Sequence, residues 1–231
     1  MAFGPFPVST VAGSFLLGFP TLFSIINPIG SSLVFYNVTL RRTHAERAIL
    51  ARRIATYGCF ILLGSLWLGG YILNFFGVSL GALRVGGGLV VAVQAWSLLM
   101  APETHESQKA GEAAPATGKR DDIAFFPLTM PLTTGPGSIS VAIALASERP
   151  TVESGVLPFF LGLTLAALAN ALIIWISYLG ADRLLRFLGE AGARAVNRLA
   201  AFLLLCIGVQ IIGSGAEGLI GPWLLGIAHR A

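Results

Sequence analysis

The sequence predicts an all-α polytopic membrane protein with six transmembrane segments, arranged as two inverted repeats of three segments each. Three observations support this fold: low charge, long apolar segments, and basic residues that alternate along the chain. Of the 231 residues, 55% are hydrophobic and 11% are charged, whereas soluble domains carry about 25% charged residues. Uncharged runs of about 20 residues are long enough to span a bilayer as helices. The ten-residue alternation typical of outer-membrane β-strands is absent from the sequence.

The predicted segments follow one another across the whole chain. They cover residues 11–40, 47–75, 81–101, 122–147, 155–181 and 197–227. The second segment has a clear start signal, because Thr43 and Glu46 have the spacing of a capping box. Residues 102–121 are rich in Pro, Glu, Ala, Gly and Lys, a composition typical of a flexible linker. We therefore expect one membrane domain over 1–231, with repeat one at 11–101 and repeat two at 122–228.

The distribution of Lys and Arg predicts the orientation. From the N-terminus to the C-terminus, the terminal and connecting segments contain 0, 5, 1, 3, 1, 4 and 1 of these residues. Basic connections are retained in the cytoplasm, so 12 of the 15 basic residues lie on that side and both termini lie outside. Topology thereby explains the net charge of +4, and no nucleic-acid partner is expected. The predicted location is the inner (plasma) membrane, in contact with lipid.

Proline and glycine interrupt the first and fourth segments, at 26–32 and 130–138. Proline removes a backbone donor and glycine loosens the helix. Unpaired peptide groups in hydrocarbon cost several kcal/mol, so irregular backbone persists there only inside protein or beside a water-filled cavity. Because each half has three segments, the halves enter the membrane from opposite sides. The breaks are then inverted counterparts, a pattern that indicates a transport site near the midplane.

The ends of the interrupted helices suggest how a solute binds. Free amides at the start of a half-helix carry partial positive charge and suit a carboxylate, whereas free carbonyls at a helix end suit an ammonium group. The predicted substrate-binding residues are Asn27, Pro28, Gly30, Ser31, Thr133, Thr134, Gly135, Pro136, Gly137, Ser138, Asn170 and Gln210. An alternative is that both breaks are packing kinks whose freed groups bond to Ser and Thr. Interhelical hydrogen bonding alone is the alternative for Asn170 and Gln210.

These breaks resemble the two signatures of the MarC family of bacterial inner-membrane proteins. The first signature, Asp or Asn followed by Pro-x-Gly, a polar residue and a Pro-apolar-Phe ending, corresponds to residues 27–35. The second, Pro-Leu-x-Met-Pro-Leu-x-x-Gly-Pro-Gly, corresponds to residues 127–137. Two positions depart from the first signature: Leu33 replaces the second proline, and Asn27 stands where Asp is often found. The resemblance, which extends to the lysine-exporter superfamily, implies a transporter of small neutral amino acids. The departure at Asn27 puts coupling through a carboxylate at that position in doubt.

The leading hypothesis is therefore a secondary transporter for amino acids such as glycine or alanine, working by alternating access. Transport of another small solute or ion is one alternative, and a non-transporting membrane regulatory protein that uses residues 102–121 as a contact arm is another. Enzyme activity is not expected, because His-Glu-x-x-His, Ser/His and paired-Asp patterns are missing from the segments. No cofactor or metal is expected, and Cys59 and Cys206 are predicted to pack as buried thiols. A homo-oligomer is left open.

Overall fold

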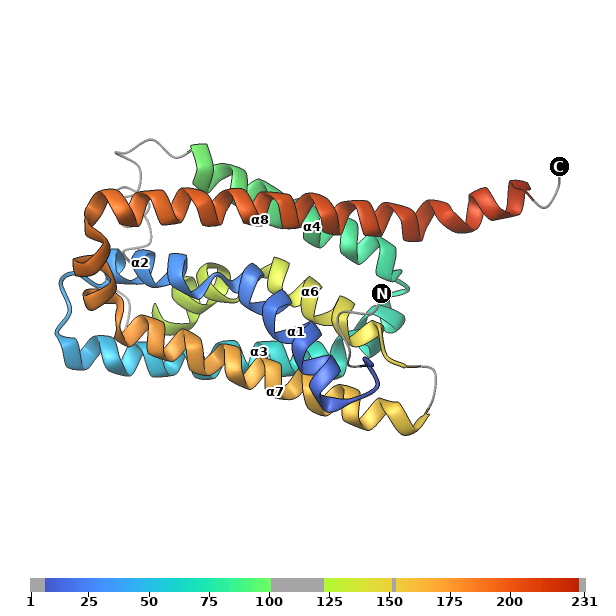
Figure 1. The fold of residues 1–231 in the computed structure, drawn as a ribbon, viewed down its shortest axis with the longest axis horizontal. Coiled ribbons are helices and arrows are strands. Elements are labelled where there is room, and N and C mark those ends of the chain that lie inside the picture. Colours follow the sequence, from blue (N-terminus) through green and yellow to red (C-terminus); the bar gives the residue numbers. More distant parts are fainter. Residues whose placement is uncertain (1–6, 101–122, 151–152, 229–231) are drawn as a thin grey trace.

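A computed structural model describes residues 7–100, 123–150 and 153–228. The predicted linker at 102–121 lies outside the described residues. The elements are α1 (Val11–Ile26), α2 (Pro28–Val38), α3 (His44–Phe76), α4 (Leu80–Met100), the π-helical segment η1 (Ala124–Thr133), α6 (Pro136–Ser147), α7 (Glu153–Leu179) and α8 (Ala181–Ala228) (Figure 1). The described part of the chain is helical and contains no strand, which confirms the predicted all-α class.

By length and composition, five stretches of the described residues can cross a membrane. They are Val11–Val38, which joins α1 and α2, His44–Phe76, Leu80–Ser97, Glu153–Leu179 and Ala201–Ile220. The predicted segment at 122–147 instead comprises η1 and the shorter apolar helix α6. The protein is thus a polytopic helical membrane protein. The division into six spans with inverted repeats, and the orientation of the termini, stay predictions.

Local signals set several helix boundaries. Thr43 and Glu46 form the predicted capping box: the Thr43 hydroxyl accepts from the Glu46 amide at 3.3 Å, and the Glu46 carboxylate accepts from the Thr43 amide at 2.9 Å. α3 ends at Gly77, whose φ of 64° lies in the left-handed region that favours glycine. α8 begins at Ala181, well before the predicted start at 197. Its first turns precede Gly189, which has a non-helical conformation with φ of 66°.

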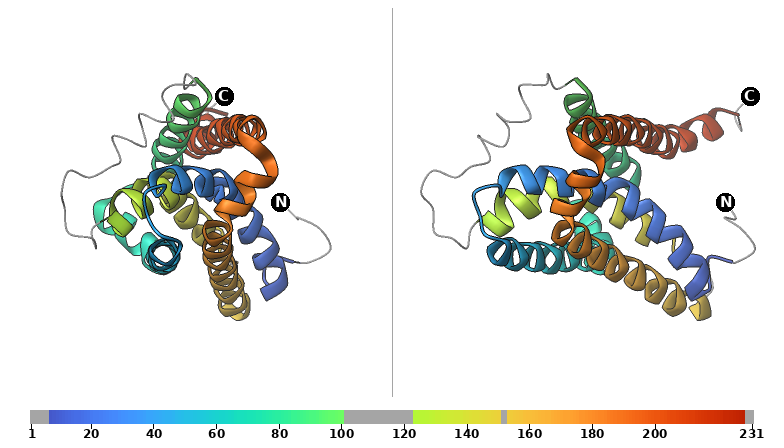
Figure 2. Two further views of the ribbon diagram at one scale, coloured as in Figure 1. Left: turned by 90° about the vertical axis from the view of Figure 1, so that its left-hand side faces the viewer. Right: turned by 60° about the vertical axis from the view of Figure 1, so that its left-hand side comes forward.

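The helices form a bundle with an antiparallel pair along one side. Figures 1 and 2 show α4 and α8 lying together on that side, while the other helices fill the bundle. α1 packs on α7, α6 packs on α3, and α3 and α7 contact each other. The first interrupted segment therefore packs against the fifth predicted segment, and the fourth against the second.

Glycines allow α4 and α8 to approach backbone to backbone. A Cβ atom on Gly88 would lie 2.8 Å from the Gly208 carbonyl oxygen, and one on Gly81 would lie 3.0 Å from the Gly215 carbonyl oxygen. Both pairs are spaced by seven residues, so they lie on one face of each helix. Small residues at such positions promote close contact between membrane helices. The two helices are antiparallel, because Gly88, the later glycine of α4, meets Gly208, the earlier glycine of α8.

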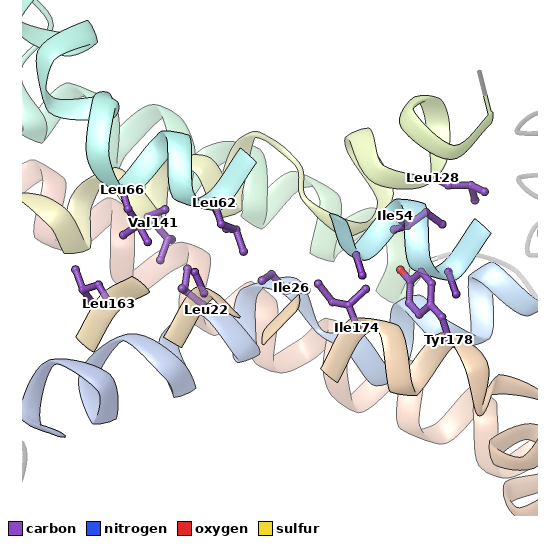
Figure 3. Packing of buried hydrophobic residues seen from close by; sticks show 14 of the residues in the cluster. Leu22, Ile26, Ile54, Leu62, Leu66, Leu128, Val141, Leu163, Ile174 and Tyr178 are labelled. Atoms are coloured by element: carbon purple, nitrogen blue, oxygen red, sulfur yellow. The ribbon is translucent and has the colours of Figure 1, made fainter. Parts of the chain in front are cut away.

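Apolar side chains fill the interior between the other helices. Figure 3 shows Leu22 and Ile26 of the first interrupted segment together with Leu62 of α3, Val141 of α6 and Leu163 of α7. Many further large apolar side chains point outward, as expected where lipid replaces water as the solvent. The expectation of two buried thiols is wrong for Cys206, which is exposed on α8, and Cys59 is half-buried. A lipid-facing helix surface accepts a thiol as readily as a protein interior does.

Ion pairs connect separate helices within the part of the chain that the structure describes. Arg47 of α3 pairs with Asp182 of α8, and its guanidinium also lies 5.4 Å from the centre of the Tyr36 ring. Arg84 of α4 pairs with Glu148, the residue that ends α6, at 3.1 Å. Both pairs are partly exposed, so each stabilises the fold by no more than about 1 kcal/mol.

Candidate substrate-binding site

Asn27 alone forms the link between α1 and α2. Its φ of 46° and ψ of 65° are left-handed, a conformation that Asn tolerates better than most residues. Its amide donates to the Phe23 carbonyl at 2.9 Å and ends α1. Its side-chain Oδ1 accepts from the Gly30 amide at 3.2 Å, and its carbonyl accepts from the Ser31 amide at 2.9 Å. The start of α2 is therefore capped by the chain itself.

The neighbouring residues fit this cap closely. A Cβ atom on Gly30 would lie 2.4 Å from Asn27 Nδ2, so any larger residue would displace the capping side chain. Ser31 is buried and its hydroxyl donates to the Ile26 carbonyl at 3.1 Å, at the end of α1. Hydroxyl and amide side chains thus satisfy much of the backbone freed at the first break. The packing-kink interpretation describes this local bonding well.

The second break has a different construction. η1 contains two residues with extended backbone, Phe126 and Met130, and Thr134 closes it by donating its amide to the Thr129 carbonyl at 2.8 Å. Gly135 follows with φ of −91° and ψ of −177°, and α6 begins at Pro136. No side chain caps the start of α6. The prediction of a break is confirmed, but the irregular backbone extends further towards the N-terminus than the predicted range of 130–138.

Tyr178 of α7 brings the two breaks together. Its hydroxyl lies 2.6 Å from Thr133 Oγ1 of η1. The single proton of the Thr133 hydroxyl is donated to the Leu128 carbonyl at 2.7 Å, so the Tyr178 hydroxyl is the donor to Thr133. The Tyr178 ring stacks on Phe35 of α2 with centroids 4.6 Å apart. One buried side chain therefore contacts residues from both interrupted segments.

Tyr178 is only 2% exposed and belongs to the main buried cluster (Figure 3). Tyr178 is not among the residues predicted from the sequence, although a hydroxyl within the apolar stretch of the fifth segment is a usable signal. Its position near the end of that segment made membership of an interfacial aromatic belt the ordinary interpretation. Tertiary packing turns the Tyr178 ring into the bundle. This burial distinguishes a residue that contacts the breaks from a residue of the interfacial aromatic belt.

Two fully buried side-chain atoms among the described residues have no hydrogen-bond partner: Thr134 Oγ1 and Asn170 Oδ1. Buried polar atoms in folded proteins are nearly always paired, so such atoms require an explanation. The Asn170 amide nitrogen donates to the Ala166 carbonyl at 2.8 Å and to the Phe19 carbonyl of α1 at 3.3 Å. Thr134 Oγ1 faces Gly58 of α3, where a Cβ atom would lie 2.8 Å away. Both residues belong to the predicted site.

Some of the other predicted residues are buried at the start of α6, and others are exposed. Gly135, Gly137 and Ser138 are buried at the start of α6, and the Ser138 hydroxyl donates to the Gly135 carbonyl at 2.9 Å. Gly137 packs tightly on α4, since a Cβ atom there would lie 2.2 Å from Val91 Cγ2. Pro136 is exposed, and Gln210 is exposed on α8. The place of Gln210 in the pathway stays a prediction.

No group of three or more His, Cys, Asp or Glu side chains gathers among the described residues in a way that suits a metal ion. The polar atoms at the breaks are hydroxyls, carboxamides and backbone groups. Such a set offers a solute hydrogen bonds and helix-end partial charges, and no fixed ionic side chain.

Comparison with known proteins gives a consistent result. Residues 12–220 match the model of the MarC family integral membrane proteins. The chain is 34% identical over 216 residues to the inner membrane protein MarC of Citrobacter koseri, covering 88% of this chain and 94% of the relative. It is 33% identical over 204 residues to a UPF0056 membrane protein of Methanocaldococcus jannaschii, covering 88% and 96%. No solved structure matches. This chain belongs to the MarC family of integral membrane proteins.

Proposed function

We propose that this protein is a secondary transporter of small neutral amino acids, of the glycine or alanine type, in the inner membrane. Alternating access would occur around the two interrupted segments. The observation that carries the proposal is the contact of buried Tyr178 with both Thr133 of η1 and Phe35 of α2, through which one side chain touches both interrupted segments. Two unrelated packing kinks have no need to contact one shared side chain.

The chemistry at the breaks suits a zwitterion. The uncapped start of α6 offers amides and partial positive charge to a carboxylate. The free Oδ1 of Asn170 and the hydroxyl of Thr134 are unused hydrogen-bonding groups in a protein interior. The buried glycines at 58, 135 and 137 leave little room for a solute side chain, which favours a small one. The break residues include no charged side chain, so a solute of zero net charge is the natural match.

Transport is tested by counterflow of labelled L-alanine and glycine in proteoliposomes that contain the purified protein. Gly135→Leu should abolish uptake, because a large side chain fills the buried start of α6. Gly64→Leu is the matched control, since a Cβ atom on Gly64 would meet no atom within 4 Å. Normal transport by Gly135→Leu would refute the assignment of the second break to the solute pathway.

The same preparation separates the alternative functions. Uptake of an unrelated solute or ion, with no response to alanine or glycine, would keep the pathway and change the substrate. Removing residues 105–118 should leave transport intact, because the proposal places the solute between the breaks. Loss of function without loss of folding in that deletion would favour a regulatory protein that uses the segment as a contact arm.

A further inference from the structure

α8 has a second face that follows the same seven-residue spacing as its contact with α4. Gly208 and Gly215 meet the backbone of α4. Gln210 and Glu217 come two residues after these glycines and lie on the opposite side of α8, because two residues turn an α-helix by about 200°. The positions along this opposite side are spaced alternately by four and three residues, and all of them are exposed: Leu199, Leu203, Cys206, Gln210, Gly213, Glu217 and Ile220. These residues form the outer seam of α8.

The outer seam has a polar residue where a lipid-facing surface is expected to be apolar. Gln210 stands at the middle of the span Ala201–Ile220, so its carboxamide lies at the depth of the hydrocarbon. Polar side chains within spanning helices almost always face the bundle interior or a water-filled cavity. Gln210 is instead exposed on the side away from α4, and hydrocarbon offers it neither a donor nor an acceptor. The fold of a single chain therefore does not account for Gln210.

Gly213, on the same seam, provides the room that a neighbouring helix needs. A Cβ atom on Gly213 would meet no atom within 4 Å, so this glycine serves no close contact inside the chain. Glycine in a spanning helix allows a second helix backbone to approach closely. α8 already uses Gly208 in this way against α4, and Figures 1 and 2 show the pair along one side of the bundle. The surface beside Gln210 is thus suited to another helix.

We propose that the outer seam is the contact surface between two copies of this chain, with their α8 helices parallel. Both copies enter the bilayer in the same orientation, so a twofold axis along the membrane normal brings each seam residue against its own counterpart. A carboxamide donates through its nitrogen and accepts through its oxygen. The two Gln210 side chains therefore satisfy each other. A single polar residue in a seam with heptad spacing also fixes the register of parallel helices.

The rest of the seam is compatible with this pairing. Glu217 lies close to the end of the span Ala201–Ile220, where the hydrocarbon gives way to the headgroups, so its carboxylate stays hydrated. Leu203 and Ile220 supply apolar contact on either side of Gln210. Lipid would cover these two residues equally well, but it would leave the carboxamide unpaired. Pairing of two copies takes the place of the predicted role of Gln210 in the solute pathway.

Cys206 offers a direct test, because it lies on the outer seam one turn before Gln210 and is exposed. The other cysteine of the chain, Cys59, is on α3 and lies off the seam. The full chain in native membranes is treated with a short bis-maleimide reagent. We expect a covalent dimer from the wild-type protein and from Cys59→Ser, and none from Cys206→Ser. A dimer that persists in Cys206→Ser, or no dimer from the wild-type protein, would overturn the proposal.

The strength of association is measured by energy transfer between labelled copies in liposomes as the ratio of lipid to protein is raised. Gln210→Leu should weaken association about tenfold, because each dimer loses its interhelical hydrogen bonds; a tenfold change corresponds to about 1.4 kcal/mol. Gly213→Leu should weaken it at least as much, because the larger side chain separates the two backbones. Gly64→Leu on α3 is the matched control, since a Cβ atom there also meets no atom within 4 Å, and it should associate like the wild-type protein.

Denaturant unfolding of dilute protein in micelles checks the single chain, and Gly213→Leu and Gly64→Leu should be equally stable in it. Equal association of Gln210→Leu, Gly213→Leu and the wild-type protein would contradict the seam. Loss of alanine counterflow in Gln210→Leu with unchanged association would also contradict it, and would return Gln210 to the solute pathway. Dimerisation through the seam without counterflow would refute the transport function and leave this proposal standing.

Discussion

Removing the hydroxyl of Tyr178 tests whether this residue joins the two breaks. Tyr178→Phe keeps the ring, so the stacking on Phe35 at 4.6 Å is retained. The change removes the hydrogen bond to Thr133 at 2.6 Å. Thr133 still donates to the Leu128 carbonyl, so the substitution leaves no donor without an acceptor.

The magnitude follows from these bonds. Hydrogen bonds between membrane helices contribute about 0.6 kcal/mol on average and about 1.7 kcal/mol at most. The short distance to Thr133 and the full burial of Tyr178 place this bond in the upper part of that range, so we expect a loss of about 1 kcal/mol in unfolding free energy. If the hydroxyl also holds the breaks in the geometry that transport requires, the alanine counterflow rate falls about fivefold, the kinetic equivalent of about 1 kcal/mol.

Both quantities are measured on one preparation, by denaturant unfolding in micelles and by counterflow in proteoliposomes. Tyr71→Phe is the matched control, because Tyr71 on α3 is 75% exposed and the same chemical change should cost less than about 0.5 kcal/mol. If Tyr178→Phe and Tyr71→Phe are equally stable, Tyr178 does not make the bond. If stability falls but counterflow is unchanged, the bond is structural and does not set the geometry of the pathway.

Three further predictions concern the frame around the breaks. Gly88→Leu should destabilise the α4–α8 pair by more than about 2 kcal/mol, because its side chain would enter a backbone contact. Gly86→Leu on the same helix meets open space and should be nearly neutral; equal unfolding free energies would disprove the close contact. Thr43→Ala should cost about 1 kcal/mol through loss of the α3 cap, measured by denaturant unfolding; wild-type stability would contradict the cap. Asp182→Asn should cost less than about 1 kcal/mol, and this difference should shrink as salt is added, because the pair with Arg47 is partly exposed; a large, salt-independent loss would contradict a screened surface pair.

Signals confined to a few neighbouring residues predicted much of the fold. The capping box at Thr43 and the prolines at 28 and 136 each act on their own turn of helix, so their effects can be read from the sequence. α8 begins before the predicted sixth segment, because the stretch that contains Arg183 and Arg186 is helical outside the apolar run that defined that segment. The extended residues Phe126 and Met130 each precede a proline, which disfavours helical backbone at the preceding residue, so this part of the irregular backbone has a local signal in the sequence.

In the candidate site, too, some features follow from local signals in the sequence and others depend on tertiary packing. Proline and glycine placed both breaks correctly, since their backbone restrictions are intrinsic. Tyr178 depends on the approach of α7 to η1 and α2, and the sequence separates these elements widely. The missing partner of Thr134 is likewise a tertiary property: a threonine normally bonds to its own helix, as Thr129 does with Ala124. Only the fold shows that Thr134 faces Gly58 instead.

Capping explains the residue choice at Asn27 in physical terms. The first signature has Asp or Asn at this position, and the neutral residue raised doubt about a coupling role. In the structure the position requires a left-handed backbone and an acceptor oxygen for the Gly30 amide. Asn and Asp both tolerate that backbone and are equally preferred N-caps, and a negative charge is also favourable at a helix start. The alternation between Asp and Asn therefore follows from the cap alone, so Asn27 argues neither for nor against coupling.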